Sequence, residues 1–136
     1  MSRTLGFELD LPLSFDAAIE RVTAALAEEG FGVLTRVDIH QAFKKKLGVE
    51  FRPYAILGAC NPGLAHRALS ERPQAGLLLP CNVTVESLEE GGSRVRIIDP
   101  DEMMKAGGLD SDPVLGEVGR EARDRLSRVA RALGGV

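Results

Sequence analysis

Two short apolar runs that end in the same dipeptide constrain the fold of this chain more than any other feature of its sequence. Each run ends in cysteine followed by asparagine: Cys60-Asn61 after residues 54–60, and Cys81-Asn82 after residues 77–79 and Pro80. Short apolar runs bounded by glycine and proline are typical of buried strands. We therefore expect both thiols to lie where a strand leaves the hydrophobic core, and we look for a functional site in this part of the chain.

Length and composition predict a single domain over residues 1–136. A chain of 136 residues can bury a sizeable core but is too short for two domains of ordinary size. Its hydrophobic content of 44% and charged content of 27% are ordinary for a soluble globular protein. No apolar run approaches the ~20 residues needed to span a bilayer, so we expect no membrane segment.

The first residues, Met1-Ser2-Arg3-Thr4, lead directly into an alternating pattern, without the apolar block of a secretory signal. The expected compartment is therefore the cytoplasm, where thiols are kept reduced. The two cysteines do not have C-x-x-C spacing, which favours free thiols over a disulfide or a redox pair.

The charge balance argues against nucleic acid as a partner. The net charge is −3, from 17 basic and 20 acidic residues. A protein that binds a phosphate backbone needs a basic face, and the one basic run here, Lys44-Lys45-Lys46, is short. We interpret this run as the solvated face of a short helix.

Alternation and helical periodicity predict a strand, a helix and a second strand in the first 39 residues. Residues 4–11 alternate between apolar and polar side chains, which is typical of a half-buried strand. Ser14 is placed to cap a helix, and Gly30 is placed to end it. A second strand then covers residues 31–39. The side chains expected to face the core from it are Phe31, Val33, Val37 and Ile39.

The middle of the chain is expected to contain two short helices around a third strand. The first helix covers residues 39–47, and the third strand ends at Cys60. Asn61, followed by proline, is a typical N-cap of a second helix. This helix should stop before Pro73, because the residue before a proline disfavours helical geometry.

The fourth and fifth strands are expected to form a hairpin. The fourth begins near Ala75 and passes Pro80, which cannot donate to a strand ladder and so favours an edge position or a bulge. Residues 90–93 contain two glycines and predict the turn into a fifth strand over residues 94–98.

The last part of the chain predicts an acidic loop and a long helix. The loop covers residues 99–112, with one short helical turn at its start. Asp112 caps the final helix, with proline at its first position, and Gly134-Gly135 closes it. The expected fold is α+β, a mostly antiparallel five-stranded sheet with two long helices on one face and short inserted helices.

The sequence resembles the family called domain of unknown function 302. The resemblance lies in the segment from 42 to 69, in LLLPCNVTV over 77–85, and in Asp99-Pro100 with a nearby methionine. It implies a compact α+β domain with the β-α-β4-α order of TATA-binding-protein-like folds, often dimeric, in bacteria and archaea. It implies no activity and no catalytic residues that can be transferred to this chain.

A thiol or metal site is one interpretation of the cysteines. The residue types that zinc or copper(I) would need are present in Cys60, Cys81, His66 and His40, but no pair has the spacing of a known metal motif. The alternative is that both cysteines are small hydrophobic residues at strand ends. The helix that starts after Asn61 would lower the pKa of Cys60, which makes Cys60 a weak candidate for a reactive group.

The acidic loop could suggest calcium. The carboxylates concerned are Asp99, Asp101, Glu102, Asp110 and Asp112. They lack the register of a calcium-binding loop, so we expect turn and cap roles for them. Met103 and Met104 would face a pocket or fill the core under the loop.

The function we expect from the sequence is a small-molecule-binding or dimeric interaction module. A pocket for a small apolar ligand would lie between the sheet and the last helix, and a two-fold homodimer is the commonest oligomer. The expected ligand-binding residues are Cys60, Asn61, Cys81, Asn82, Arg52 and His66. The alternative is a thiol- or metal-dependent enzyme that uses Cys60. No cofactor and no bound metal follow from these residues.

Overall fold

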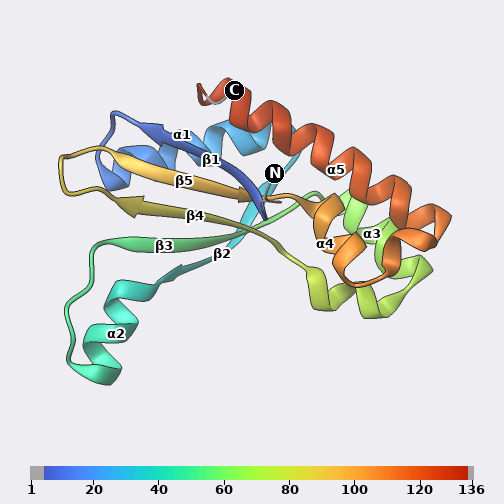
Figure 1. The fold of residues 1–136 in the computed structure, drawn as a ribbon, viewed down its shortest axis with the longest axis horizontal. Coiled ribbons are helices and arrows are strands. Elements are labelled where there is room, and N and C mark those ends of the chain that lie inside the picture. The colour runs from blue at the N-terminus through green and yellow to red at the C-terminus, as the bar shows by residue number, and fades with distance from the viewer. Residues whose placement is uncertain (1–4, 135–136) are drawn as a thin grey trace.

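Five strands form one antiparallel sheet in the order β1-β5-β4-β3-β2 (Figure 1). The computed structural model describes residues 5–134. The strands are β1 (Gly6–Leu11), β2 (Gly32–Asp38), β3 (Tyr54–Cys60), β4 (Cys81–Ser87) and β5 (Ser93–Ile98). The sheet is therefore antiparallel at every pairing, as the tight turn between β4 and β5 predicted.

The helices are inserted between these strands. They are α1 (Phe15–Glu28), α2 (Ile39–Leu47), α3 (Pro62–Glu71), α4 (Pro100–Ala106) and α5 (Pro113–Ala132), with short 3-10 helices η1 (Pro73–Leu78) and η2 (Leu109–Ser111). Without the shorter helices the order is β-α-β4-α. The expected α+β domain is confirmed.

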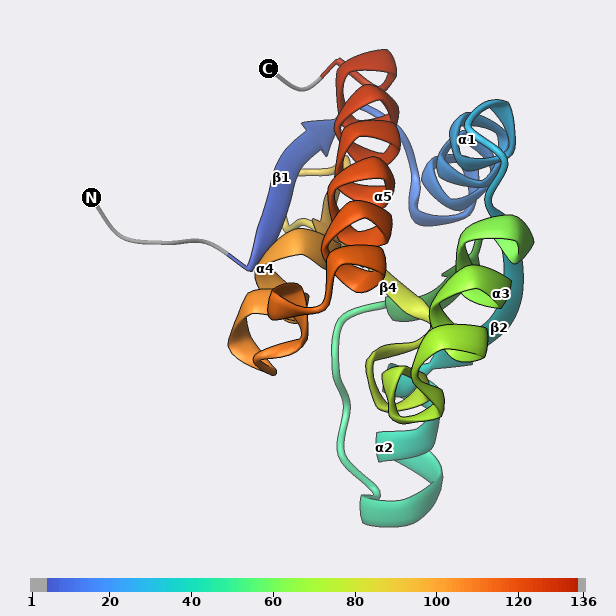
Figure 2. The same ribbon diagram turned by 90° about the vertical axis from the view of Figure 1, so that its right-hand side faces the viewer.

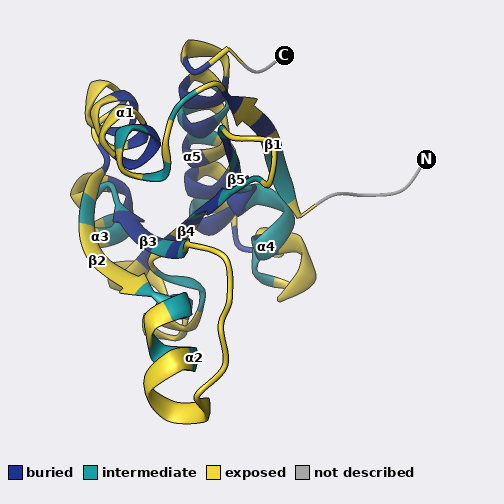
Figure 3. Ribbon diagram, turned by 90° about the vertical axis from the view of Figure 1, so that its left-hand side faces the viewer, coloured by how far each residue is buried: buried dark blue, intermediate teal, exposed yellow. Residues whose placement is uncertain are grey.

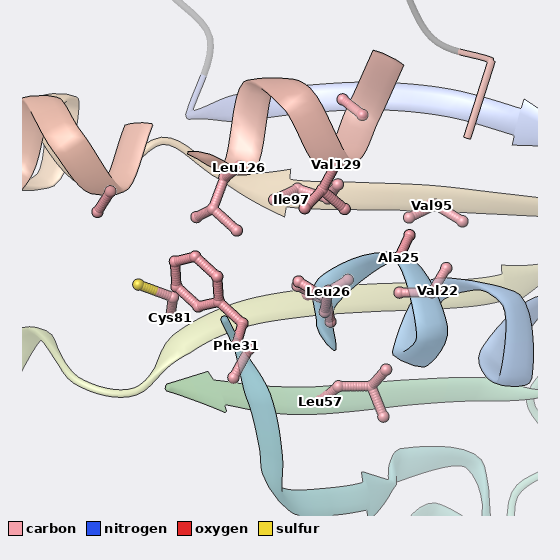
Figure 4. Packing of buried hydrophobic residues seen from close by; sticks show 14 of the residues in the cluster. Val22, Ala25, Leu26, Phe31, Leu57, Cys81, Val95, Ile97, Leu126 and Val129 are labelled. Atoms are coloured by element: carbon pink, nitrogen blue, oxygen red, sulfur yellow. The ribbon is translucent and has the colours of Figure 1, made fainter. Parts of the chain in front are cut away.

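The hydrophobic core lies between the sheet and the two long helices. Helices α1 and α5 lie side by side on the same face of the sheet (Figure 2). Their apolar side chains point toward those of the strands (Figure 4), as seen for Val22, Leu26, Leu126, Val129, Leu57 and Ile97. Burial of this apolar surface is the main force that holds the layers together.

The helix ends predicted from the sequence are confirmed. The backbone N–H of Ala17 donates to Ser14 Oγ at 3.3 Å, which caps α1. After α1, Gly30 has a φ of +82°, the left-handed conformation that glycine adopts without a Cβ clash. The carboxylate of Asp112 caps α5, because it accepts hydrogen bonds from two N–H groups of the first turn.

The predicted start of the fourth strand was wrong. Residues 73–78 form η1 instead of a strand, and β4 begins only at Cys81. Leu77, expected in a buried run, is 88% exposed. Prolines at positions 73 and 80 bracket the segment, and three consecutive leucines are too short a run to pair along the sheet.

The edge position or bulge predicted at Pro80 was also wrong, because the register of β4 against β3 has no shift. Strand β4 lies in the centre of the sheet, between β5 and β3. Pro80 precedes the first paired residue, Cys81, so its missing N–H removes no hydrogen bond from the ladder.

Strand β2 is one of the two edge strands of the sheet, and most of its side chains are exposed (Figure 3). Phe31 is buried as expected and Val33 is half-buried, but Val37 is exposed and Ile39 already belongs to α2. The expectation of an inward-facing Val37 was wrong: this side chain is 46% exposed on the edge strand.

Helix α2 projects from the end of the sheet opposite α3 and α4 (Figure 1). None of its residues is buried. It is held at its base by His40, whose Nδ1 accepts a hydrogen bond from the backbone N–H of Tyr54 at 3.0 Å. Rings of Phe43 and Phe51 pack edge to face beside it, with centroids 5.3 Å apart.

The acidic segment is more helical than predicted. Where a loop with one turn was expected, α4 and η2 follow each other. Asp99 caps α4 by accepting a hydrogen bond from the N–H of Asp101 at 3.0 Å, and Pro100 occupies the first helical position. This is the same cap-and-proline pattern that predicted α3 and α5, so the sequence contained the evidence for α4.

Thr4 and Gly135, assigned from the sequence to the first strand and to the end of the last helix, lie outside the described residues. No helix within residues 5–134 is long and apolar enough to cross a membrane.

Candidate functional site

A cavity of about 290 Å³ lies where β3 ends and β4 begins. Its walls come from the ends of these strands and from α3, η1, α4 and α5, which gather at the same end of the molecule (Figures 1 and 2). Most of the lining is aliphatic. Of the described residues that line the cavity, none is charged and none is histidine. Such a cavity suits an apolar ligand better than a charged one.

The pairing of β3 with β4 brings the two cysteines to this cavity. Cys81 pairs with Ala59, the neighbour of Cys60, so the two cysteines lie one position apart across the ladder. Consecutive side chains of a strand point to opposite faces, so Cys81 faces the helices and Cys60 leaves its strand toward the other face. Both line the cavity because it lies at the strand ends. Their opposite directions disfavour a disulfide, and both are free thiols.

The two thiols differ in burial. Cys81 is buried beside Phe31 (Figure 4), whereas Cys60 is half-buried. Burial raises the pKa of the Cys81 thiol to about 11, and the nearby Cys60 adds to this effect. Cys81 is therefore protonated at neutral pH and is a poor nucleophile.

The two asparagines also differ in role. Asn61 Oδ1 accepts a hydrogen bond from the N–H of Leu64 at 3.1 Å and caps α3, as predicted. Its amide group lies beside Gly30, where a Cβ would come within 2.9 Å of Asn61 Nδ2. Asn82 is exposed in β4 and lines the cavity. Asn82 is thus freer than Asn61 to contact a ligand.

The structure does not bring Arg52 and His66 to the cavity. His66 is exposed on α3 and is absent from the lining. Arg52 precedes β3 and lies near the opposite end of the strand from Cys60. Its Nε donates to Glu86 Oε2 at 2.6 Å. His40 lies at that distant end too and is bound to Tyr54, so neither histidine joins the cysteines.

Arg52 belongs to an ion-pair network on the open face of the sheet. Glu86 is buried there and accepts hydrogen bonds from both Arg52 and Arg96. Desolvation by burial opposes the ionised form of Glu86, but the bonds from the two arginines outweigh it and lower the pKa of this carboxyl. Arg96 also binds Glu8 at 2.7 Å. The cations of this network are already paired, so they offer little to a ligand.

A second, more open hollow of about 500 Å³ lies on the same face. It is bordered by Phe7, Thr84 and Arg96 among others. The Thr84 hydroxyl is buried and has no hydrogen-bond partner among residues 5–134. The two charged side chains that line this hollow, Glu8 and Arg96, are paired with each other, so they offer little to a ligand.

Two carboxylates of the acidic segment, Asp99 and Asp112, have the cap roles expected for them. Asp99 caps α4 and binds Arg123 Nε at 3.0 Å, and Asp112 caps α5 and binds Arg72 Nε at 3.0 Å. Arg72 and the N–H groups of α5 outweigh desolvation and lower the pKa of Asp112. Within the described part of the chain no three residues of the types His, Cys, Asp and Glu are grouped to hold a metal ion.

Two methionines line the cavity. The sequence did not decide whether they would face a pocket or fill the core. Met104 is buried and Met103 is half-buried, both on α4. Gly119 of α5 makes room for Met104, because a Cβ at position 119 would lie 3.1 Å from Met104 Cγ. The Asp99-Pro100 cap could have predicted the helix that carries them, but only packing shows that they face the cysteines' cavity.

Comparisons with known proteins agree with this fold. The chain is similar to the crystal structure of an uncharacterized conserved protein DUF302 from Bacillus stearothermophilus, with 30% sequence identity and a TM-score of 0.81. The similarity covers 93% of this chain and 96% of that one. No curated protein matches the chain. The family model described as "Domain of unknown function DUF302" matches residues 7–133, and the chain belongs to this family.

Proposed function

We propose that this protein binds a small apolar molecule in the cavity at the ends of β3 and β4. The observation that carries the proposal is the cavity itself, which combines a volume of about 290 Å³ with an aliphatic, uncharged lining. Ligand sites of proteins are typically apolar hollows of roughly this size or larger, with a few polar groups at chosen points. Here those polar groups are the Cys60 thiol and the Asn82 amide.

The alternative function, an enzyme that uses Cys60, has less support. A cysteine nucleophile is usually activated by a neighbouring base. Neither described histidine lines the cavity, and Cys81 is held in its protonated form. The binding function needs no such partner, because an apolar ligand is held mainly by exclusion of water.

Filling the cavity tests the proposal. We expect the neutral fluorescent probe N-phenyl-1-naphthylamine to bind saturably, and Ala65→Phe to weaken its binding by at least about tenfold because the ring occupies the cavity. Ala65 is half-buried on α3, so the ring can enter without replacing a core residue.

The matched control is Ala24→Phe, which adds the same ring at an exposed helical position of α1 that does not line the cavity. It should leave probe affinity unchanged. Absence of saturable binding to the parent protein, or equal loss in both variants, would exclude the cavity as a ligand site. Fast modification of Cys60 by electrophiles, abolished by a bound substrate analogue, would favour the enzyme instead.

We also propose that the protein is a homodimer. The observation that favours it is a group of exposed apolar side chains on and around α2, at the end of the molecule opposite the cavity: Val37, Leu47, Val49 and Phe51. Exposed apolar side chains that gather in one part of a protein commonly mark an interface. Because α2 carries no buried residue of its own, a second copy of the chain would supply the surface that it lacks.

Mass measurement in solution tests the dimer. Light scattering should give twice the chain mass of 14.6 kDa, and Val37→Lys with Leu47→Lys should convert the dimer to monomer. Lysine at the exposed position Ala24 is the matched control. A parent protein that is monomeric at high micromolar concentration would refute the proposal.

A further inference from the structure

Residues 39–53 form an arm that projects from the body of the protein (Figures 1 and 3). The arm consists of α2 and the segment that leads into β3. Every residue from 44 to 53 is exposed. The exposed side chains include apolar ones, among them Leu47 at 68% and Val49 at 46%. A long exposed segment with apolar side chains is typical of a surface that another molecule covers.

Internal contacts fix the shape of the arm. Gly48 ends α2 in the left-handed conformation, with a φ of +66°, and its N–H donates to the carbonyl oxygen of Lys44 at 3.0 Å. The ring of Phe51 packs against that of Phe43 within the arm and against that of Tyr54 at its base, the latter at a centroid distance of 6.2 Å. The arm is therefore ordered before it meets a partner, which lowers the entropic cost of binding.

The arm and the rest of the chain carry opposite charges. With histidine counted as neutral, the arm has three lysines and one arginine against one glutamate, a net charge of +3. Since the whole chain has a net charge of −3, the other residues together carry −6. Lys44 pairs with Glu50 inside the arm, but Lys45 and Lys46 pair with no carboxylate of residues 5–134. These two lysines are available to an acidic surface of another molecule.

The turn between β4 and β5 is an acidic surface at the same end of the molecule (Figure 1). This acidic turn covers residues 88–92 and contains Glu89 and Glu90, both exposed, and no basic residue. Neither glutamate pairs with a cation of the described chain. The turn lies near the base of the arm, because the N–H of Ser87 donates to the carbonyl oxygen of Pro53 at 2.9 Å. Arm and turn thus flank one end of the sheet, where each can face a second copy.

A two-fold axis makes a contact between arm and turn reciprocal. In an isologous interface, every contact between two different surfaces is repeated with the two copies exchanged. If the arm of one copy reaches the acidic turn of its partner, the partner's arm reaches the acidic turn of the first copy. Both contacts then join opposite charges, whereas contact of arm with arm, or of turn with turn, would join like charges and be repulsive.

We propose that a second copy of this chain binds the arm, with Lys45 and Lys46 of each copy against Glu89 and Glu90 of the other. This inference rests on the proposed homodimer and deepens it by naming the surface that the arm meets. The exposed apolar side chains of the arm form the desolvated centre of the interface. The charges at its rim select the partner and its orientation.

Charge reversal tests the contact from both sides. The arm variant carries Lys45→Glu and Lys46→Glu, and the turn variant carries Glu89→Lys and Glu90→Lys. All four positions are exposed, so neither variant changes the core. In the dimer of either variant like charges face each other, and we expect its dissociation constant to rise at least about tenfold over that of the parent. Sedimentation equilibrium measures these constants, and circular dichroism confirms that each variant is folded.

Mixing the two variants tests whether arm and turn meet each other. In the mixed dimer the negative arm of one chain faces the positive turn of the other, and the positive arm faces the negative turn. Both contacts are attractive again, so we expect the mixture to form heterodimers with about the affinity of the parent homodimer. Native mass spectrometry identifies the heterodimer when one variant is labelled with nitrogen-15. A mixture that associates no more tightly than the separate variants would overturn the proposal.

The matched control is Asp110→Lys with Asp124→Lys. It changes the net charge by the same amount as the turn variant, at exposed positions on η2 and α5. The control should leave the dissociation constant of the dimer unchanged. A loss of affinity equal to that of the turn variant would assign the effect to net charge and overturn the contact between arm and turn.

The same measurements separate this inference from the proposed homodimer. A monomeric parent protein would refute both. A parent dimer that Val37→Lys with Leu47→Lys dissociates, and that the arm and turn variants leave intact, would keep the homodimer and refute the contact between arm and turn. Binding of a monomeric parent to phosphatidylglycerol vesicles, lost in the arm variant, would assign the arm to an anionic membrane instead.

Discussion

The two Cys-Asn segments have the same dipeptide, but its residues differ in burial and in structural role between the two places. Cys60-Asn61 closes strand β3 and opens helix α3, whereas Cys81-Asn82 opens strand β4. In the first segment the asparagine has a structural role as a cap and the thiol is half-buried. In the second the asparagine is exposed and the thiol is buried. The role of each residue follows from the element that it begins or ends.

The position of proline explains the difference. Pro62 follows Asn61, and a proline at the first helical position together with an asparagine N-cap starts a helix. Pro80 precedes Cys81, and the alternating residues Val83 and Val85 continue from it into the core. The first cysteine is therefore at a strand end, while the second is the first inward-facing residue of a central strand.

Thiol reactivity should show the largest difference between the segments. With a pKa of about 11 against an ordinary 9.0, Cys81 has about a hundredfold less thiolate at pH 8 than an unperturbed thiol. Its thiolate fraction rises with pH until the pH passes that pKa. Timed labelling with a disulfide reagent should thus modify Cys60 first and Cys81 at least about a hundredfold more slowly than an unperturbed thiol. Equal labelling rates at Cys60 and Cys81 in the folded protein would contradict the assignment of Cys81 as the more buried thiol.

Serine substitution should separate the two cysteines in stability. Cys81→Ser places a hydroxyl in an apolar wall without a designed partner, which should lower the free energy of unfolding by about 1–3 kcal/mol. Cys60→Ser, at the half-buried position, should change it by less than about 0.5 kcal/mol. Urea unfolding followed by circular dichroism measures both. A larger loss of unfolding free energy for Cys60→Ser than for Cys81→Ser would contradict the assignment of Cys81 as the buried thiol.

The asparagine cap should give an intermediate effect. Asn61→Ala removes the hydrogen bond to the N–H of Leu64 and should cost about 1 kcal/mol of unfolding free energy. Asn61→Asp keeps an acceptor at this position and should retain most of the stability. Loss of stability in the aspartate variant equal to that in the alanine variant would argue against a capping role.

The second asparagine should give the smallest effect. Asn82 is exposed and, within residues 5–134, neither caps a helix nor joins an ion pair, so Asn82→Ala should change the unfolding free energy by less than about 0.5 kcal/mol. The same denaturation experiment provides the comparison with Asn61→Ala. A cost near 1 kcal/mol at both positions would remove the distinction between the two segments.

Local patterns predicted those elements whose boundaries are set within a few residues. Ser14, Asn61 and Asp112 were recognised as caps because a cap is satisfied by an N–H two or three residues away. The hairpin between β4 and β5 was likewise predicted from its glycines. The failures occurred where a local pattern was ambiguous: the leucines of 77–79 resembled a strand, and only one short helical turn was expected after Asp99-Pro100, where α4 extends to Ala106.

The candidate site was predicted in part. Cys60, Asn61, Cys81 and Asn82 line the cavity, whereas Arg52 and His66 do not. Arg52 precedes the strand that Cys60 ends, and this strand of seven residues separates the two along the sheet. Met103 and Met104 were missed as partners because nothing in their own segment indicates what α4 packs against.

What the sequence by itself determined is the set of elements: the antiparallel hairpin, the capped helices, and two cysteines at strand ends. Those features depend on backbone geometry and on contacts between near neighbours. What only the tertiary structure decided is which strand is central, which thiol is buried, and that four sulfur atoms from three segments share a cavity. These depend on the packing of α3, α4 and α5 at one end of the sheet, where contacts between distant residues, each worth little alone, act together.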